Sequence, residues 1–559
     1  MDEATLQLSQ ADQETQFPFM TKQVVWIPDQ NSGSYPSGQV TFDLASISNS
    51  GKFFDANSST LVIPLVMNVA VAGTVTANSI SADVFSASLK SSFTTLINSM
   101  SVELTNNSIV NVTNFSNLDM GYRLLTGSSF EDMQNFGQSI GFTKDTAESI
   151  VYTGAAGTNG VGEQNNLLGE SVFTTAGGWG ATSINSNKGR LSRMINTSFD
   201  PSSKADFTSA ALCSAIGKNY CALTTAASKL TNVTYYILAT LPLRVLHPVF
   251  SKIPLVKGSY LRLIFNTNTN CTSTIALTAA NYTGYTTTSQ NGTFPCMLSA
   301  NLAANGAVYT GATSVALSLG IGKSVSGAFS HPTMTSCRIY ANLFEMSPIY
   351  QEKYLEMVPT KRVVYNDILS FQVLNVARGG NFSQILTNGI SRPRYLLLCC
   401  QIAGAIHGTN ALSTDVNYTA GVGQLGSPFN SPFSSSPMTT APYGAISNFN
   451  VLVSGSALYQ SNINYGFEHW LQEVRPSNAI NGGIGLGFSS GILSQQDWES
   501  GYRYIYVDLS RKASQAQDDI SRSIQIIGTN SAAYALDIFA IVGYEREFTV
   551  STGTGSLVI

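Results

Sequence analysis

The chain has 559 residues, of which only 11% are charged, and its net charge at pH 7 is −4. Typical soluble domains are about 25% charged, so a large neutral surface of this kind is usually covered by copies of the same chain or by partners. The weak acidic charge argues against binding nucleic acid through bulk electrostatics, and no apolar run reaches the roughly 18 residues of a membrane span. The composition therefore predicts an assembly protein.

The N-terminal segment carries neither a targeting signal nor a basic arm. Residues 1–20 contain Asp2, Glu3, Asp12 and Glu14 but no Lys or Arg. They lack the positive and apolar regions of a signal peptide, and they lack the cations with which an arm would neutralise phosphates. We therefore expect synthesis in a reducing cell interior.

Strands dominate the predicted structure. Apolar and polar residues alternate at 39–44, where Val40, Phe42 and Leu44 share one face, and such a period of two is typical of half-buried strands. Clusters of Gly, Asn, Ser or Pro bound each segment of this kind. The further segments lie at residues 100–104, 260–265, 338–344, 371–376, 503–509 and 535–542.

Helical signals are few and short. Ser116 with Asp119, and Ser129 with Asp132, have the spacing of capping boxes, in which a hydroxyl serves the first-turn amides and a carboxylate follows three residues later. A further helix is predicted at 466–473. Because long alternation of strands and helices is missing, a doubly wound or TIM-type scaffold is disfavoured.

Three long segments have the composition of loops, at residues 151–190, 267–330 and 404–445. Structureless loops of this length are uncommon within compact domains, so we expect surface decorations with strands of their own. A single core stops growing at roughly 250 to 300 residues, so the chain needs at least two domains. The boundary is predicted near residues 347–348, before a more charged connection.

Two short motifs suggest catalysis only weakly. Residues 487–491 match the GxSxG form of a hydrolase, but they close a Gly-rich run and no capped helix follows, so a turn or strand edge is predicted instead. Residues 322–324 resemble the end of a phosphate-binding loop, yet Leu317 stands where its first Gly is required. We expect no enzyme activity from either motif.

The remaining candidate residues also favour a structural role. The tyrosines at 502, 504 and 506 could form a stacking platform, but no Lys and Arg surround them as nucleic acid would require, so packing against a neighbouring sheet or subunit is predicted. The cysteines show neither CxxC pairs nor zinc spacing with His, and we expect small buried hydrophobes. Single, isolated histidines predict no triad or metal site. The histidines are His247, His331, His407 and His469, and the cysteines are Cys213, Cys221, Cys271, Cys296, Cys337, Cys399 and Cys400. We therefore predict no catalytic, metal-binding or cofactor-binding residues and no cofactor.

The order of several segments resembles a known family. A hairpin at 99–111 leads to a helix at 114–125 and a strand start at 141–146, and a strand, a short helical corner and a returning strand follow at 241–265. The second half has matching features at 391–398, 430–433, 467–473 and 507–510. This order resembles double jelly-roll major capsid proteins, and is closest to those of polinton-like viruses and virophages. The resemblance spans about residues 22–548.

The resemblance implies an all-β chain of two tandem eight-stranded antiparallel jelly rolls, with a few short helices and long loop insertions. The expected division is an N-terminal tail at 1–21, a first jelly roll at 22–346, a second at 347–548 and a C-terminal tail at 549–559. It further implies a homotrimer that forms a pseudo-hexameric capsomer and tiles an icosahedral shell around double-stranded DNA. The long Thr- and Gly-rich insertions depart from the family pattern.

The resemblance places the chain in the virion after assembly inside the host cell. Its expected partners are further copies of itself and a minor capsid or penton protein with a single jelly roll, without sequence-specific binding of nucleic acid. The resemblance does not imply whether the particle contains an internal membrane or cement proteins. The alternative is a trimeric viral fibre, adhesin or receptor-binding protein, which usually shows short sequence repeats that are not visible here.

Overall fold

The computed structural model describes residues 18–73, 85–89, 92–142, 194–195, 221–226, 229–277, 282–288, 294–300, 312–403, 444–480, 491–512, 520–532 and 535–558. The predicted insertion at 151–190 lies outside the described residues, as does nearly all of the one at 404–445. Within the part that is described, no helix is both long and apolar enough to cross a membrane.

The first half forms two facing sheets from eight strands. In chain order these are β1 (Phe19–Pro28), β2 (Gln39–Asp43), β3 (Phe53–Gly73), β5 (Ile97–Leu104), β6 (Asn107–Val112), β9 (Lys229–Pro242), β11 (Leu261–Thr267) and β16 (Arg338–Met346). One sheet, here called the β1 sheet, has the order β1-β16-β3-β9, and the other, the β2 sheet, has the order β2-β11-β5-β6. Every pairing among these strands is antiparallel.

The second half repeats this arrangement. Its strands are β17 (Thr360–Val376), β18 (Asn381–Ile390), β19 (Pro393–Ile402), β20 (Ile446–Val453), β21 (Ser456–Ala457), β22 (Ile505–Asp508), β23 (Arg522–Asn530) and β24 (Leu536–Ser551). The β17 sheet has the order β17-β24-β19-β22 and the β18 sheet the order β18-β23-β20-β21. When the eight strands of each half are counted in chain order, one sheet contains strands one, eight, three and six, in that order. It faces a sheet of strands two, seven, four and five. This is the double-sheet order of a jelly roll, so the predicted fold class is confirmed.

Shorter elements connect these strands. The additional strands are β4 (Phe85–Leu89), β7 (Met194–Ile195), β8 (Cys221–Ala226), β10 (Val256–Lys257), β12 (Cys271–Leu277), β13 (Tyr282–Thr288), β14 (Cys296–Ala300), β15 (Ala312–Ile321) and β25 (Leu557–Val558). The α-helices are α2 (Ala45–Ser48), α3 (Ser116–Gly127), α4 (Phe130–Asn135), α8 (Leu243–Leu246), α9 (Val249–Lys252), α11 (Pro348–Met357), α12 (Phe467–Ile480) and α13 (Gln495–Asp497). Tighter or wider turns are η1 (Phe93–Leu96), η2 (Gly137–Ile140), η7 (Trp498–Tyr502) and η8 (Ser510–Lys512).

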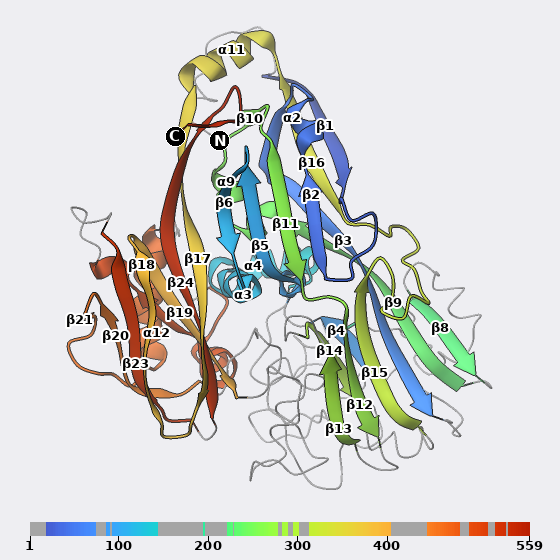
Figure 1. The fold of residues 1–559 in the computed structure, drawn as a ribbon, viewed down its shortest axis with the longest axis vertical. Coiled ribbons are helices and arrows are strands. Elements are labelled where there is room, and N and C mark those ends of the chain that lie inside the picture. Colours follow the sequence, from blue (N-terminus) through green and yellow to red (C-terminus); the bar gives the residue numbers. More distant parts are fainter. Residues whose placement is uncertain are drawn as a thin grey trace.

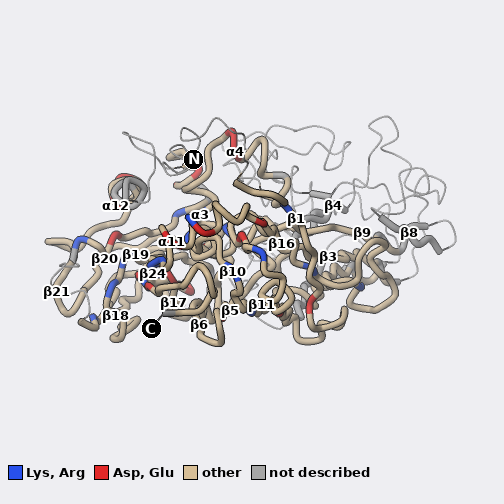
Figure 2. The backbone as a smooth tube through the Cα atoms, turned by 90° about the horizontal axis from the view of Figure 1, so that it is seen from above, with Lys and Arg blue, Asp and Glu red and all other residues tan. Residues whose placement is uncertain are grey.

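The two halves lie side by side. Figure 1 shows α11, which connects them, at one end of the molecule, with β4, β8 and β12–β14 at the opposite end of the first half. In the view of Figure 2 the sheets follow one another in a row, from β18 and β20 through β24 and β17 to β6, β5 and β11, and then to β16, β3 and β9. Helix α3 lies in the middle of this row.

The chain ends contribute to the fold. Strand β1 starts at Phe19 and pairs along its length with β16. At the other end β24 continues to Ser551 and pairs with β25, and the amide of Lys257 donates to the carbonyl of Thr552 at 3.0 Å. The segment at 549–559, expected to be a tail, therefore belongs largely to the β17 sheet.

Strand β15 shows that the segment at 267–330 is more than decoration. Strands β12 and β13 do extend the sheet, as expected for an insertion with its own strands. Strand β15, however, pairs with β3 from Gly73 to Leu65, and its Leu317 and Leu319 are fully buried in the core of the first half. Part of the predicted insertion is thus a core strand.

Replacing Leu317 by Ala should test this assignment. The change leaves a cavity beside β3, so we expect the free energy of unfolding to fall by about 2–5 kcal/mol. Leu374→Ala is the matched control, because that leucine is 51% exposed and its truncation should cost less than about 0.5 kcal/mol. Denaturant unfolding of both variants measures the difference, and equal midpoints would contradict a core position for β15.

Candidate functional site: the junction between the two halves

The hydrophobic core is continuous between the halves. On β24, Phe539 and Ile541 belong to the same cluster as the core of the first half, whereas the alternate residues Ile538 and Ala540 belong to a separate cluster inside the second half. Successive side chains of a strand point to opposite faces. The outer face of the β17 sheet is therefore covered by the first half.

Helix α3 forms part of this cover, beside α9 and β6 of the first half. The ring of Phe115, just before the helix, packs edge-on against Phe539 with 5.0 Å between centroids. About two turns further along the chain, Tyr122 stacks on Tyr506 at 5.6 Å and meets Tyr504 edge-on at 5.4 Å. These large rings bury much apolar area in defined geometry, so they fix how the two halves are oriented.

The N-terminus of α3 differs from the prediction. The structure shows a capping box at Ser129 and Asp132, as expected, but none at Ser116 and Asp119. The carboxylate of Asp119 instead accepts hydrogen bonds from Arg123 Nε and from the hydroxyl of Tyr395 on β19, both at 2.8 Å. The side chain that was expected to cap its own helix thus bonds to the other half.

A buried carboxylate forms the second part of the junction. Asp367 on β17 is completely buried and accepts a hydrogen bond from Arg546 on β24 at 2.9 Å. The Tyr544 hydroxyl donates to the same oxygen at 3.4 Å, and His247 Nε2 of the first half lies 3.6 Å from the other oxygen. A charge this deeply buried is tolerated only where cations and donors surround it.

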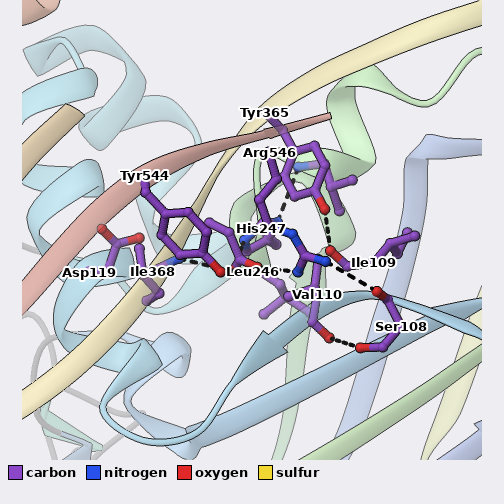
Figure 3. Close-up of polar contacts among 12 residues, drawn as sticks. Ser108, Ile109, Val110, Asp119, Leu246, His247, Tyr365, Ile368, Tyr544 and Arg546 are labelled. Carbon is purple, nitrogen blue, oxygen red and sulfur yellow. Dashed lines mark hydrogen bonds and ion pairs between the residues drawn. The ribbon is translucent and has the colours of Figure 1, made fainter. Parts of the chain in front are cut away.

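Further bonds from the second half fix this group to the first (Figure 3). The hydroxyl of Tyr365 donates to the carbonyl of Ile109 on β6, and Arg546 donates to the carbonyl of Ser108 at 3.3 Å. Figure 3 shows Tyr365 and Arg546 beside Ile109 and Ser108, with His247 between them and Tyr544. Side chains on β17 and β24 therefore donate hydrogen bonds to backbone carbonyls of β6.

Electrostatics favour a neutral His247 and an ionised Asp367. Burial lowers the pKa of His247, although the adjacent Asp367 opposes that shift. Its Nδ1 accepts a hydrogen bond from the amide of Val249 at 3.2 Å, which places the proton of the neutral ring on Nε2, facing Asp367. Burial opposes the ionisation of Asp367, but His247 and Arg546 together hold its pKa below the usual value.

The tyrosines at 502, 504 and 506 are all buried. Tyr502 ends the turn η7, while Tyr506 lies on β22 between Tyr122 and Tyr395. Packing between neighbouring elements is therefore confirmed, and these buried rings cannot serve as an exposed platform for bases or sugars.

The weak motifs prove to be turns where they are described. Gly322 has φ +67°, and a Cβ there would lie 2.1 Å from the carbonyl oxygen of Thr335, so residues 322–324 need Gly for a tight turn and do not cradle phosphate. Of residues 487–491, only Gly491 is described. It has φ +64°, and a Cβ would lie 2.2 Å from the carbonyl oxygen of Leu125, at the end of α3. This glycine permits close approach of the halves.

The isolated histidines and cysteines have structural surroundings. His331 accepts the amide of Met334 at 3.3 Å, His469 accepts that of Gly466 at 3.3 Å, and His407 and Cys213 lie outside the described residues. Cys271, Cys296, Cys337, Cys399 and Cys400 are buried, which confirms the prediction for these five. Among the residues described, no group of three His, Cys, Asp or Glu side chains could hold a metal.

The charged residues of the junction were missed in the sequence. Asp367 and Arg546 stand nearly 180 positions apart, and no local spacing connects them. Both strands carry further charged residues, such as Arg362 on β17 and Glu545 on β24, so nothing in the local sequence distinguishes the buried pair.

Comparison with solved structures shows the same fold over almost the full chain. A chain of the Sputnik virophage, solved by cryo-EM, matches with a TM-score of 0.52 at 10% identity, covering 98% of this chain and 91% of that one. The chain has the double jelly-roll fold. The mavirus major capsid protein matches with a TM-score of 0.42 at 11% identity over 98% and 92% of the two chains, and the Faustovirus major capsid protein with 0.43 at 11% over 98% and 94%. No family model matches the chain, and no curated protein sequence does.

Removing the buried carboxylate should weaken the junction strongly. We expect Asp367→Ala to lower the free energy of unfolding by about 3–5 kcal/mol, since it leaves Arg546 without its buried partner. Glu547→Ala on the neighbouring strand β24 is the control, because its exposed pair with Arg362 should contribute less than about 1 kcal/mol. Chemical denaturation followed by tyrosine and tryptophan fluorescence compares them, and equal losses would contradict the role assigned to Asp367.

Acid should destabilise the protein through His247. With the folded pKa below the ordinary value of 6.5, the unfolded chain binds a proton that the folded chain does not, so stability falls as pH drops from about 7 towards the folded pKa. The lowered pKa of Asp367 adds a further loss below about pH 4. His247→Asn keeps an acceptor for Val249 and removes the first effect. Melting temperatures measured between pH 7.5 and 5 should vary less in this variant than in the wild type. A pH dependence equal to that of the wild type would count against the role assigned to His247.

Proposed function

We propose that the chain is a major capsid protein whose homotrimers form pseudo-hexameric capsomers of an icosahedral virion. The observation that carries the proposal is the double jelly-roll fold, shared along nearly the whole chain with a chain of a virophage particle. The role is structural and not enzymatic. We keep the boundary between the two jelly rolls at residues 346–347 as part of this proposal, with the first beginning at β1 and the second ending at β25.

The junction supports this role physically. The outer face of the β17 sheet packs against the first half, so the two barrels of each chain are held together as a rigid pair. Both barrels have the same strand order. Three such pairs supply six similar barrels for a six-neighbour position in a shell, and closed rings of identical contacts are the usual form of such assemblies. The low charge fits surfaces that are covered by other copies.

The proposed shell encloses double-stranded DNA without a cationic arm. Capsid proteins that condense nucleic acid during assembly need such an arm to neutralise phosphates, with binding that weakens as salt rises. The first twenty residues contain no Lys or Arg. We therefore propose that trimers and shells form without nucleic acid, that DNA enters a preformed shell, and that a single jelly-roll minor protein closes the vertices.

The oligomeric state tests the proposal directly. Light scattering of the purified protein at micromolar concentration should give about three times the chain mass of 59.6 kDa. Negative-stain images should show pseudo-hexagonal particles. A stable monomer would refute the capsid role, and elongated fibres would favour the alternative of a viral fibre or adhesin.

A further inference from the structure

Charged residues are unevenly distributed between the two ends of the molecule. The strands at the end of the first half away from α11, which are β4, β8, β12, β13 and β14, contain no charged residue. Figure 1 shows α11 at the other end, with α2 and β10 near it. Three separate segments contribute lysines to this end, here called the α11 end, and these are Lys252, Lys257, Lys353 and Lys361. A chain with a net charge of −4 thus carries cations together at one end.

Backbone hydrogen bonds hold two of these segments together. The amide of Lys257 on β10 donates to the carbonyl of Thr552 at 3.0 Å, and the amide of Thr552 donates to that of Pro359 at 3.1 Å. Pro359 stands two residues before Lys361. Lys252 ends α9, and the stretch from it to Lys257 contains no acidic residue. Three lysines therefore lie close to one another in the fold.

Helix α11 packs on the same stretch and adds the fourth lysine. The ring of Tyr354 meets Phe53 edge-on at 5.8 Å, and its hydroxyl donates to the carbonyl of Leu255 at 3.0 Å. Lys353 is the neighbour of Tyr354 in the helix. Within the described part of the chain, none of the four ammonium groups forms an ion pair with a carboxylate. Their positive charge is therefore available to a partner.

The α11 end also exposes large apolar side chains. On the helix, Ile349 and Met357 are 53% and 66% exposed. Together with Lys353 they are spaced four residues apart, which places all three on one side of the helix. Glu352 and Glu356 border this side, so the helix alone is not cationic. The excess positive charge of this end comes from the lysines beside the helix.

Lysines next to exposed apolar side chains fit one class of partner. At a membrane surface, ammonium groups meet the headgroups of anionic lipids, while apolar side chains enter the boundary between headgroups and acyl chains. Duplex DNA would also attract the lysines, but its phosphate backbone offers no apolar layer to Ile349 and Met357. The two features together favour lipid over nucleic acid.

We propose that the α11 end binds the surface of a membrane that contains anionic lipids. This inference goes beyond the proposed capsid role, and no step of it uses the oligomeric state. The bound protein has α11 against the lipid and the uncharged strands β12, β13 and β14 away from it. The proposed contact residues are Lys252, Lys257, Lys353, Lys361, Ile349 and Met357.

Neutralising two exposed lysines tests the electrostatic part of the proposal. We expect Lys252→Gln combined with Lys361→Gln to weaken binding to vesicles of phosphatidylcholine and phosphatidylserine by about tenfold or more. Lys323→Gln combined with Arg378→Gln is the matched control, because it removes the same charge from exposed turns after β15 and β17. Co-sedimentation of the full-length protein with vesicles measures binding. A wild type that binds these vesicles no better than pure phosphatidylcholine would overturn the proposal.

Replacing the apolar side chains separates lipid from DNA. Ile349→Gln combined with Met357→Gln keeps the charge and suits a helix, and we expect it to weaken vesicle binding by about fivefold or more. Circular dichroism checks the folding of each variant. Unchanged vesicle binding in this variant would overturn the assignment to lipid, as would tighter binding of the wild type to duplex DNA than to the vesicles.

Chemical modification of the unsubstituted protein covers variants that fold poorly. Acetylation read by mass spectrometry should be slower at Lys252, Lys257 and Lys361 when vesicles are bound, whereas Lys323 should react equally with and without them. Equal reactivity of all four lysines in both conditions would overturn the proposal. Because light scattering measures the oligomer without lipid, that result would leave the capsid role standing.

Discussion

The structure depends on one constraint, which is that the outer face of the β17 sheet is buried against the first half of the chain. The outer face of the β17 sheet carries fully buried residues such as Leu397 and Phe539, and elements of the first half, α3, α9 and β6 among them, lie against this face. Burial of each such side chain stabilises by about 1.5–3 kcal/mol. Separating the halves would expose an apolar surface too large for a soluble chain, so the two jelly rolls behave as one body.

Polar contacts fix the position of one half relative to the other. Apolar faces alone could slide, but Asp119 of the first half accepts a hydrogen bond from the Tyr395 hydroxyl of the second, and Asp367 of the second half lies 3.6 Å from His247 Nε2 of the first. A buried carboxylate displaced from its donors would cost several kcal/mol. Hydrophobic area thus provides the affinity between the halves, and the two carboxylates set their register.

Local patterns in the sequence predict the strands well and the junction poorly. Strands such as β11 and β16 alternate buried and partly exposed residues along most of their length, which is the signal that the apolar pattern carries. In β15 the same alternation of Val315, Leu317 and Leu319 is diluted by Ser, Thr and Gly, so the strand resembled a loop. Asp119 has a spacing suited to a cap, yet it bonds to Tyr395, some 276 positions further on. Pairings over such distances depend on topology, which neither periodicity nor spacing encodes.

The place of β24 has a consequence for how the protein is made. This strand contributes Phe539 and Arg546 to the junction and pairs with β17, yet it follows α3 by more than 400 positions in the chain. During translation α3 leaves the ribosome long before the surface that covers it, and a domain that waits in this way exposes apolar groups. A chain that stops before residue 536 therefore leaves the apolar face of α3 without Phe539 against it. Burial of that helix depends on synthesis of β24.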